Sequence, residues 1–397
     1  MRVTTANAFE TTVATLQQRQ QALQRAQDQL TSGKRVARAS DDPAAAARIE
    51  RALASAARSD ADQRALAASR NAMEQAEGAL GGAVDLMQQI RELVVAAGNA
   101  SYSDTERANL GAQIRGYRDQ LLAIANRGDG AGGYLFGGQG SAQPPFVDGV
   151  GGVAFRGQDG VTEVQAGDRL PMTLDGAAAW LQAHSGNGVF VSEPDPTNGP
   201  GAWIDAGRVT DPSALTGDPY RVVFQVSGGT TTYSVLRNGA PTAVAGQPYV
   251  AGQAIPIDGM ALTVSGTPAN GDAFDLTPSA SDLSVFDALD RLVADLRTGN
   301  RSAAQVTQTV QTGLRDIDAS MARLQLQRAT AGESLNHMDA VEDRLADAKL
   351  HAQTERSTAE DLDMVQAVSD FQNQQTGYEA ALKAYSTVQR LSLFQYL

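Results

Sequence analysis

The stretch "TSGKRVARASDDP", residues 31–43, decides how the N-terminal part of this chain folds. It holds a Gly-Lys pair and two adjacent carboxylates, so it fits a phosphate-binding loop, an acid pair or a bend between two helices. A Walker A loop requires Gly, four residues and then Gly-Lys-Ser/Thr after a strand. Here Asp28 stands at the first glycine position and Arg35 at the Ser/Thr position. The pattern therefore disfavours a phosphate site.

A bend between two helices explains the same residues better. Gly33 is suited to the left-handed conformation that follows a helix end. Asp42 is suited to the N-cap of the next helix and Pro43 to its first position, before the strong helix formers "AAAARIERALASAA". We therefore predict that one helix ends at Gly33 and another begins at Asp42 and Pro43, with Lys34 to Ala39 between them.

The helix before the bend, from about Thr5 to Gly33, carries one narrow apolar seam. Its large apolar residues recur every seven positions, the spacing of a coiled coil. They are Phe9, Leu16, Leu23 and Leu30. So little apolar surface makes the helix marginal alone, so we expect it to be frayed until it finds a partner.

Two further helices follow the bend. The first continues the seven-residue spacing, and the second starts at a capping box formed by Ser103 and Glu106. The spacing residues of the first are Leu66, Met73, Leu80, Met87 and Val94, and the apolar face of the second is Leu110, Ile114, Tyr117, Leu121 and Ile124.

The middle of the chain, Tyr134 to about Pro278, differs in composition from the helical parts. Gly, Pro, Thr and Val dominate and helical periodicity is lost, which predicts an all-β region. Within it, "YRVVFQVSGGTTTYSVLRNG" indicates two strands joined through Gly228 and Gly229.

Helices return from Ser281, and the last one again has apolar residues seven apart. These are Met364, Phe371, Tyr378 and Tyr385, with Val368 and Leu382 four residues after Met364 and Tyr378, before the ending "LSLFQYL". The two ends of the chain thus carry matching seams, and the simplest arrangement pairs them.

The predicted fold class is α+β: a long coiled-coil-like helical rod formed by both chain ends, with an inserted all-β domain in the middle. We divide the chain into three parts. They are a terminal coiled coil of 1–40 with 358–397, a helical rod with a β-hairpin region of 41–184 with 281–357, and an outward-facing β domain of 185–280.

Composition excludes several classes of protein. A net charge of −13 and the absence of a strong basic stripe disfavour nucleic-acid binding. The chain has no cysteine, which excludes disulfides, Fe–S clusters and thiol catalysis. No segment approaches the roughly 20 apolar residues of a membrane span, and the N-terminus lacks a signal-peptide pattern. We expect no membrane insertion.

No catalytic constellation is found. A G-x-G-x-x-G pattern at Gly128, Gly130 and Gly133 follows a helix and precedes a β-like segment, the reverse of a dinucleotide site. The three histidines are scattered without metal-ligand spacing, so we expect them on the surface. We predict no enzyme activity, cofactor, metal or catalytic residue.

The sequence resembles the bacterial flagellin superfamily. "QLTSGKRVARASDDPAAAARI" (29–49) is similar to its N-terminal signature, and "LSLFQYL" to its C-terminal ending. "YLFGGQGSAQPPF" (134–146) and "VSGTPANGDAF" (264–274) resemble the subfamily that joins hook to filament. "STAEDLDMVQAV" keeps only Ser357, Asp361 and Asp363 of the Ser-x-Ile-x-Asp-x-Asp pattern of filament flagellin, which argues against the filament subunit.

The resemblance implies a location and partners. Such proteins are exported unfolded by the flagellar type III apparatus, without a cleaved signal peptide, and become part of the extracellular flagellum. An export chaperone guards their C-terminal helices. They assemble as a ring of copies between hook-associated protein 1 and flagellin.

On this basis the two seams form the expected assembly interface, and the bend acts mechanically through Gly33, Asp42 and Pro43. Two alternatives stay open: a flagellin-type filament subunit, and a ligand-binding module in the β region lined by Trp180, Trp203 and Phe224. The expected interface residues are Phe9, Leu16, Leu23, Leu30, Met364, Phe371, Tyr378, Leu382, Tyr385, Leu391, Leu393 and Phe394.

Overall fold

The structure is a computed structural model that describes the backbone of residues 2–394 and the side chains of residues 9–387. The chain forms two compact units. One holds Met1–Arg64 with Val341–Leu397, and the other holds Ala65–Ala340. Long helices supply most of the first unit, and the second combines helices with all the strands.

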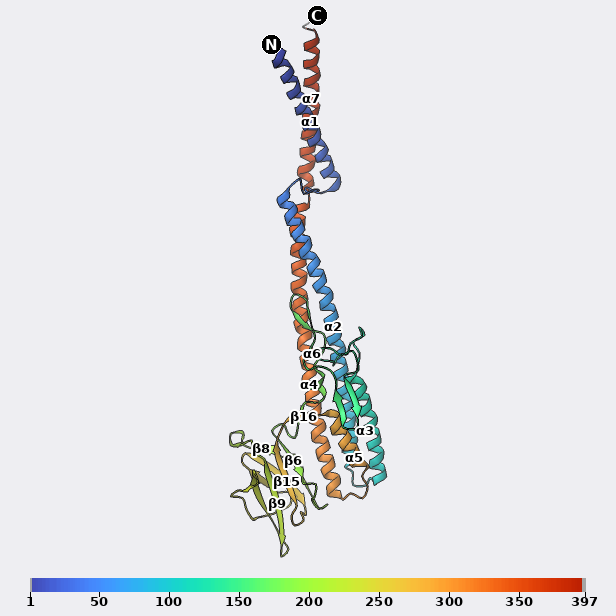
Figure 1. Ribbon diagram of the computed structural model, residues 1–397, viewed down its shortest axis with the longest axis vertical. Coiled ribbons are helices and arrows are strands. Elements are labelled where there is room, and N and C mark those ends of the chain that lie inside the picture. Colours follow the sequence, from blue (N-terminus) through green and yellow to red (C-terminus); the bar gives the residue numbers. More distant parts are fainter. Residues whose placement is uncertain (1, 395–397) are drawn as a thin grey trace. The chain divides into compact units, whose positions relative to one another are not determined.

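Two terminal helices pair in the first unit. Helix α1 (Arg2–Ser32) lies beside α7 (Met364–Phe394), as Figure 1 shows in blue and red. Helix α1 ends as predicted, because Gly33 has a φ of +69° and its N–H donates to the Gln29 carbonyl at 2.8 Å. The predicted pairing of the two chain ends is confirmed.

Helices α2 (Pro43–Ala97) and α6 (Ala303–Glu360) contribute to both units. In the first unit Lys349 of α6 pairs with Asp60 of α2 at 2.6 Å. In the second unit the seven-residue spacing is buried, since the side chains of Met73, Leu80 and Met87 are at most 1% exposed. The predicted apolar stripe of α2 is therefore a core.

Two shorter helices pack on each other in the second unit. Helix α3 (Asp104–Ala125) starts at the predicted capping box of Ser103 and Glu106 and contacts α5 (Val285–Arg297). The sequence prediction placed a helix from Ser281 onward, and this start is wrong. Strand β16 (Ser281–Leu283) comes first and pairs with β5 (Ala183–His184), and Ser284 then caps α5.

The region between α3 and the β domain is not purely β, contrary to the prediction. Hairpins β1 (Phe146–Gly149) with β2 (Gly152–Phe155) and β3 (Glu163–Gln165) with β4 (Arg169–Pro171) are followed by the short helix α4 (Gly176–Trp180). Asp175 caps α4 through a 2.9 Å bond from the Ala178 N–H. Five residues are too few for helical periodicity to show in the sequence.

The inserted β domain is a sandwich of two antiparallel sheets. One sheet has the order β11-β10-β9-β15-β6, with β12 on β10, and the other has β13-β14-β7, with β8 on β14. Their bounds are β6 Phe190–Pro194, β7 Ala202–Ile204, β8 Arg208–Val209, β9 Tyr220–Ser227, β10 Thr230–Arg237, β11 Ala240–Pro241, β12 Gln247–Pro248, β13 Ala254–Ile257, β14 Met260–Gly266 and β15 Ala273–Pro278, with a 3₁₀ turn at Pro212–Ala214.

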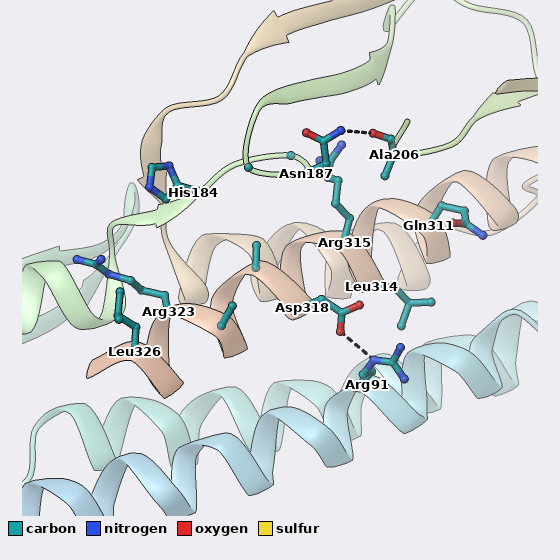
Figure 2. Close-up of a pocket in the computed structure, with 14 residues that line it drawn as sticks. Arg91, His184, Asn187, Ala206, Gln311, Leu314, Arg315, Asp318, Arg323 and Leu326 are labelled. Atoms are coloured by element: carbon teal, nitrogen blue, oxygen red, sulfur yellow. Dashed lines mark hydrogen bonds and ion pairs between the residues drawn. The ribbon is translucent and has the colours of Figure 1, made fainter. Parts of the chain in front are cut away.

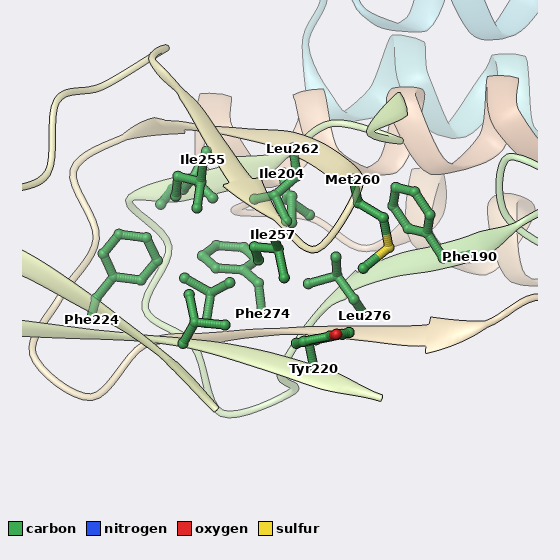
Figure 3. Close-up of a cluster of buried hydrophobic side chains, with 14 residues drawn as sticks. Phe190, Ile204, Tyr220, Phe224, Ile255, Ile257, Met260, Leu262, Phe274 and Leu276 are labelled. Carbon is green, nitrogen blue, oxygen red and sulfur yellow. The ribbon is translucent and has the colours of Figure 1, made fainter. Parts of the chain in front are cut away.

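The two sheets share one apolar core, which Figure 3 shows. Phe224, Leu262 and Phe274 are fully buried in it. The alternation of side chains along β9 explains the burial of Phe224. Every second residue of this strand points into the core, and these residues are Tyr220, Val222 and Phe224. The predicted hairpin is confirmed, with Ser227 opposite Thr230 and a positive φ at both turn glycines.

A second aromatic core lies among the helices. The Trp180 ring stacks on Phe286 at 5.8 Å and meets Phe136 edge-on at 5.6 Å. Beside it the buried guanidinium of Arg118 binds Asp290 at 2.8 Å and also Asp148. Burial alone would lower the pKa of Arg118, but the hydrogen bonds from the two carboxylates outweigh it and raise that pKa. The guanidinium thus joins hairpin β1–β2 to α3 and α5.

Candidate assembly site

The seams predicted at the two chain ends face each other along α1 and α7. The rings of Phe9 and Tyr385 lie 5.8 Å apart and are tilted by 42°. Further along, Gly377 of α7 lies so close to the Arg19 guanidinium that a Cβ there would approach it to 2.7 Å. We call the apolar residues of α1 and α7 the terminal seam.

The terminal seam is not buried within a single chain. Leu16, Leu23, Leu30, Phe371, Tyr378 and Tyr385 are half-buried. Phe9 is 50% exposed, Met364 49% and Leu382 42%. Leu391, Leu393 and Phe394 lie outside the residues whose side chains are described. The pairing of two helices therefore leaves much of the predicted surface free for further contacts.

Two valines enlarge this surface: Val368, which the sequence pattern placed four residues after Met364, and Val365, which the prediction missed. Val365 is 84% exposed and Val368 is 43% exposed, on the face of α7 next to Met364. Val365 directly follows Met364 and lies outside the seven-residue spacing, so a search for that spacing overlooks it. Its signal was a β-branched apolar residue in the first turn of an otherwise Gln-rich helix.

The bend between α1 and α2 is held by its two aspartates. Asp42 accepts hydrogen bonds from the Ala44 and Ala45 N–H groups at 3.1 and 3.0 Å and pairs with Arg35 at 3.3 Å. These contacts, the Ala45 bond first, lower the pKa of Asp42. Asp41 accepts the Arg38 N–H at 2.8 Å inside the bend. The predicted cap at Asp42 and helix start at Pro43 are confirmed.

A second bend separates α6 from α7. Asp363 caps α7 by accepting the Val365 and Gln366 N–H groups at 3.0 and 3.1 Å. At the end of α6 the Asp361 carboxylate accepts the Ser357 hydroxyl. Of the three residues that matched the C-terminal superfamily pattern, Asp361 and Asp363 thus lie in the helix break, and Ser357 binds Asp361 from the last turn of α6.

The two bends bind each other. The Arg35 N–H donates to the Glu360 carbonyl at 2.7 Å, and the Leu362 N–H donates to the Gly33 carbonyl at 3.0 Å. The Arg35 guanidinium also reaches the Ala359 carbonyl at 2.7 Å. We call residues 33–42 with 360–363 the joint. The sequence predicted the first bend but not its contact with residues 360–363, because no local pattern links positions more than 300 residues apart.

The alternative of a ligand-binding module is not favoured by the aromatic residues it named. Trp180 belongs to the helical aromatic core, whereas Phe224 is buried in the sandwich beside Phe274. Trp203 is half-buried on β7. The structure therefore does not gather these three side chains around one pocket.

A groove of about 660 Å³ does lie where the β domain meets α6 (Figure 2). His184 of β5 and the loop residue Asn187 stand on one side of it, and Leu314 and Leu326 of α6 stand on the other. The Arg91 side chain in the groove forms an ion pair with Asp318, with 2.9 Å between Nε and Oδ1. The lining contains no Ser, Thr, Cys or Lys side chain that could act as a nucleophile.

The histidines and acidic residues of the described part of the chain form no metal site. His184, His337 and His351 are exposed, as expected. In the part of the chain that the structure describes, no three His, Asp or Glu side chains are grouped to hold a metal ion. None of the helices there has the length and apolarity needed to cross a membrane.

Family profiles match both ends of the chain. The bacterial flagellin N-terminal helical region matches residues 3–141, and the bacterial flagellin C-terminal helical region matches residues 314–397. A D2-like domain of flagellar hook-associated protein 1 matches residues 195–278, which lie within the β domain. The helical ends and the insert are thus matched by separate profiles.

Individual relatives and solved structures agree with these profiles. The chain is 25% identical to flagellar hook-associated protein 3 of Salmonella typhimurium over 100% of this chain and 99% of that protein. It is similar to the crystal structure of flagellar hook-associated protein 3 from Legionella pneumophila, with 25% identity and a TM-score of 0.72 over 77% of this chain and 97% of that one. It is also similar to FlgL of Xanthomonas campestris, with 27% identity and a TM-score of 0.69 over 78% and 99% of the two chains.

Proposed function

Because the chain belongs to the bacterial flagellin superfamily, whose two helical regions match more than half of it, we propose that it is a structural subunit of the bacterial flagellum. Its place is the junction between hook and filament, as the names of its relatives suggest. The subunit acts by binding neighbouring subunits, not by catalysis.

The observation that carries this proposal is the half-exposed terminal seam. A protein that worked alone would not keep Phe9, Met364 and Val365 at 50%, 49% and 84% exposure on two paired helices. Neighbouring subunits bury such surface and gain about 25 cal/mol per Å² of apolar area covered. The terminal helices are the assembly element, through the twelve interface residues predicted from the sequence.

The three parts of the chain have separate roles in this proposal. Residues 1–40 with 358–397 form the inner coiled coil, 41–184 with 281–357 form the surrounding rod, and 185–280 face outward. Copies of the chain form a ring that meets hook-associated protein 1 on one side and flagellin on the other. The chain reaches this place outside the cell by type III export, with a chaperone on its C-terminal helices.

A filament subunit is the second candidate, favoured by the match of both flagellin helical regions. The two candidates differ in whether copies of the chain continue to add. Purified protein that extends long filaments from seeds by itself would favour the filament, and growth that stops after a ring would favour the junction.

Substitution within the seam tests the junction role. Phe371→Ser with Tyr378→Ser should leave the exported chain soluble but prevent filaments from staying attached to hooks, because apolar contact area on α7 is lost. Electron microscopy of hooks in cells that carry only the variant gives the readout. Val226→Ser removes a 37% exposed valine from β9 and is the matched control, with attachment unchanged.

The larger change is deletion of 358–397. The remaining chain should keep the second unit folded and should not join filament to hook. Cells with attached filaments despite either change would contradict the assembly role of the terminal helices.

A further inference from the structure

The joint contains a carboxylate whose burial calls for an explanation. Glu360 is 7% exposed, although it is the last residue of a helix in a thin part of the molecule. Burying a carboxylate costs several kcal/mol unless cations and hydrogen bonds compensate. Lys34 of the first bend and Arg356 of α6 supply the two cations, the second at 3.0 Å.

The main chain of the same residue adds a second attachment. Its carbonyl accepts the Arg35 N–H at 2.7 Å and the Val36 N–H at 3.4 Å. Val36 is itself buried. Glu360 therefore holds the N-terminal bend by its side chain and by its backbone, and Lys34 pairs with Asp361 in an antiparallel bridge next to it.

This bridge also agrees with the pairing of the terminal helices. Phe9 lies 25 residues before Lys34, and Tyr385 lies 24 residues after Asp361. The Phe9 and Tyr385 rings therefore meet at nearly equal distances along the chain from the bridge between Lys34 and Asp361. Their contact has the same register as the bridge. A seven-residue seam alone tolerates slippage by a whole heptad, so register needs a fixed point.

We infer that Glu360 is a positioning residue that fixes the register of α1 against α7 by clamping Lys34 and the following backbone. The inference rests on the proposed assembly function, since the register decides which seam residues neighbouring subunits meet. Without the clamp both helices still form, but they pair in several registers, and the exposed apolar surface loses its single arrangement.

Spin labels measure the register directly on the purified full-length chain. The absence of native cysteine allows labels at Gln20→Cys and Gln375→Cys, two exposed positions on α1 and α7. We expect one narrow distance distribution in the unaltered chain and a broad or multiple distribution in Glu360→Gln. We also expect hydrogen exchange at the Arg35 and Leu362 amides to become about tenfold faster or more.

Two controls separate this role from general destabilisation. Asp60→Asn breaks the half-buried 2.6 Å pair with Lys349 between α2 and α6 of the same unit, and it should change neither readout. Lys34→Met should reproduce the broadening, and Lys34→Arg, which keeps the cation, should restore the narrow distribution.

An unchanged distribution in Glu360→Gln would overturn the inference, as would equal broadening in Asp60→Asn or a broad distribution in the unaltered chain. Because all readouts come from single chains, they are independent of filament attachment. Failure of the junction role would instead appear in the attachment assay with an intact register.

Discussion

The terminal seam and the β sandwich use similar apolar residues in opposite ways. In the sandwich, fourteen side chains form one core, with Phe224, Leu262 and Phe274 at 0% exposure. In α1 and α7, no described side chain is buried. Two sheets enclose a layer between them, whereas two helices share only one narrow stripe.

The difference teaches which part of the chain is self-sufficient. The sandwich gains its apolar burial within one chain, so its stability belongs to the monomer. The terminal seam is only partly buried within one chain, and neighbouring subunits would bury the remainder of its apolar surface. Stability and assembly are therefore carried by different regions and should respond to different substitutions.

Matched phenylalanine substitutions should give the largest contrast. Phe274→Ala leaves a cavity in the sandwich core and should lower the free energy of unfolding of the β domain by about 3–5 kcal/mol. Phe9→Ala removes a ring that is 50% exposed and should cost the monomer less than about 1 kcal/mol. Calorimetry of the two full-length variants makes the comparison, and equal losses would remove the distinction.

Glycine substitutions should give a smaller effect of similar size in both regions. Gly33 at the end of α1 and Gly229 in the β9–β10 turn have φ values of +69° and +81°, and a Cβ at either would meet no atom within 4 Å. Alanine at each should cost about 1 kcal/mol from backbone conformation alone.

The readouts of the two glycine variants should differ. Gly33→Ala should accelerate hydrogen exchange in the joint, and Gly229→Ala should lower the melting temperature of the sandwich. A loss several times larger at either site would indicate contacts beyond the local backbone.

Acid should have the smallest effect, and it should act on both regions. Hydrogen bonds from Thr197 and the Arg221 guanidinium lower the pKa of Asp195 in the β domain to about 2. A lowered carboxylate pKa contributes stability above the unfolded value, and this contribution is lost as pH falls from about 4 towards 2. Asp42 at the joint, whose pKa is also lowered, should lose its cap contribution in the same direction.

Melting curves recorded between pH 5 and pH 2 test this expectation for the sandwich. Asp195→Asn should flatten the decline of its melting temperature with falling pH. An identical decline in the variant and the unaltered chain would show that other carboxylates control acid stability.

Local sequence signals predicted much of the fold. Gly33, Asp42 and the Ser103–Glu106 box specified helix ends through their own backbone bonds, and Gly228-Gly229 specified a hairpin. The short elements α4 and β16 were not predicted, because they have too few residues to show a hydrophobic period. For the candidate site, seven-residue spacing indicated the seam but missed Val365, which lies outside that spacing.

The sequence by itself determined where the helices begin and end and which residues form the seams, since capping and periodicity depend on neighbours within a few positions. The tertiary structure alone decided that Glu360 joins Lys34 across the two bends and that Trp180 belongs to the helical core and not to the sandwich. Such contacts depend on the path of the chain between distant positions. That path is set by all the packing together, and no single stretch encodes it.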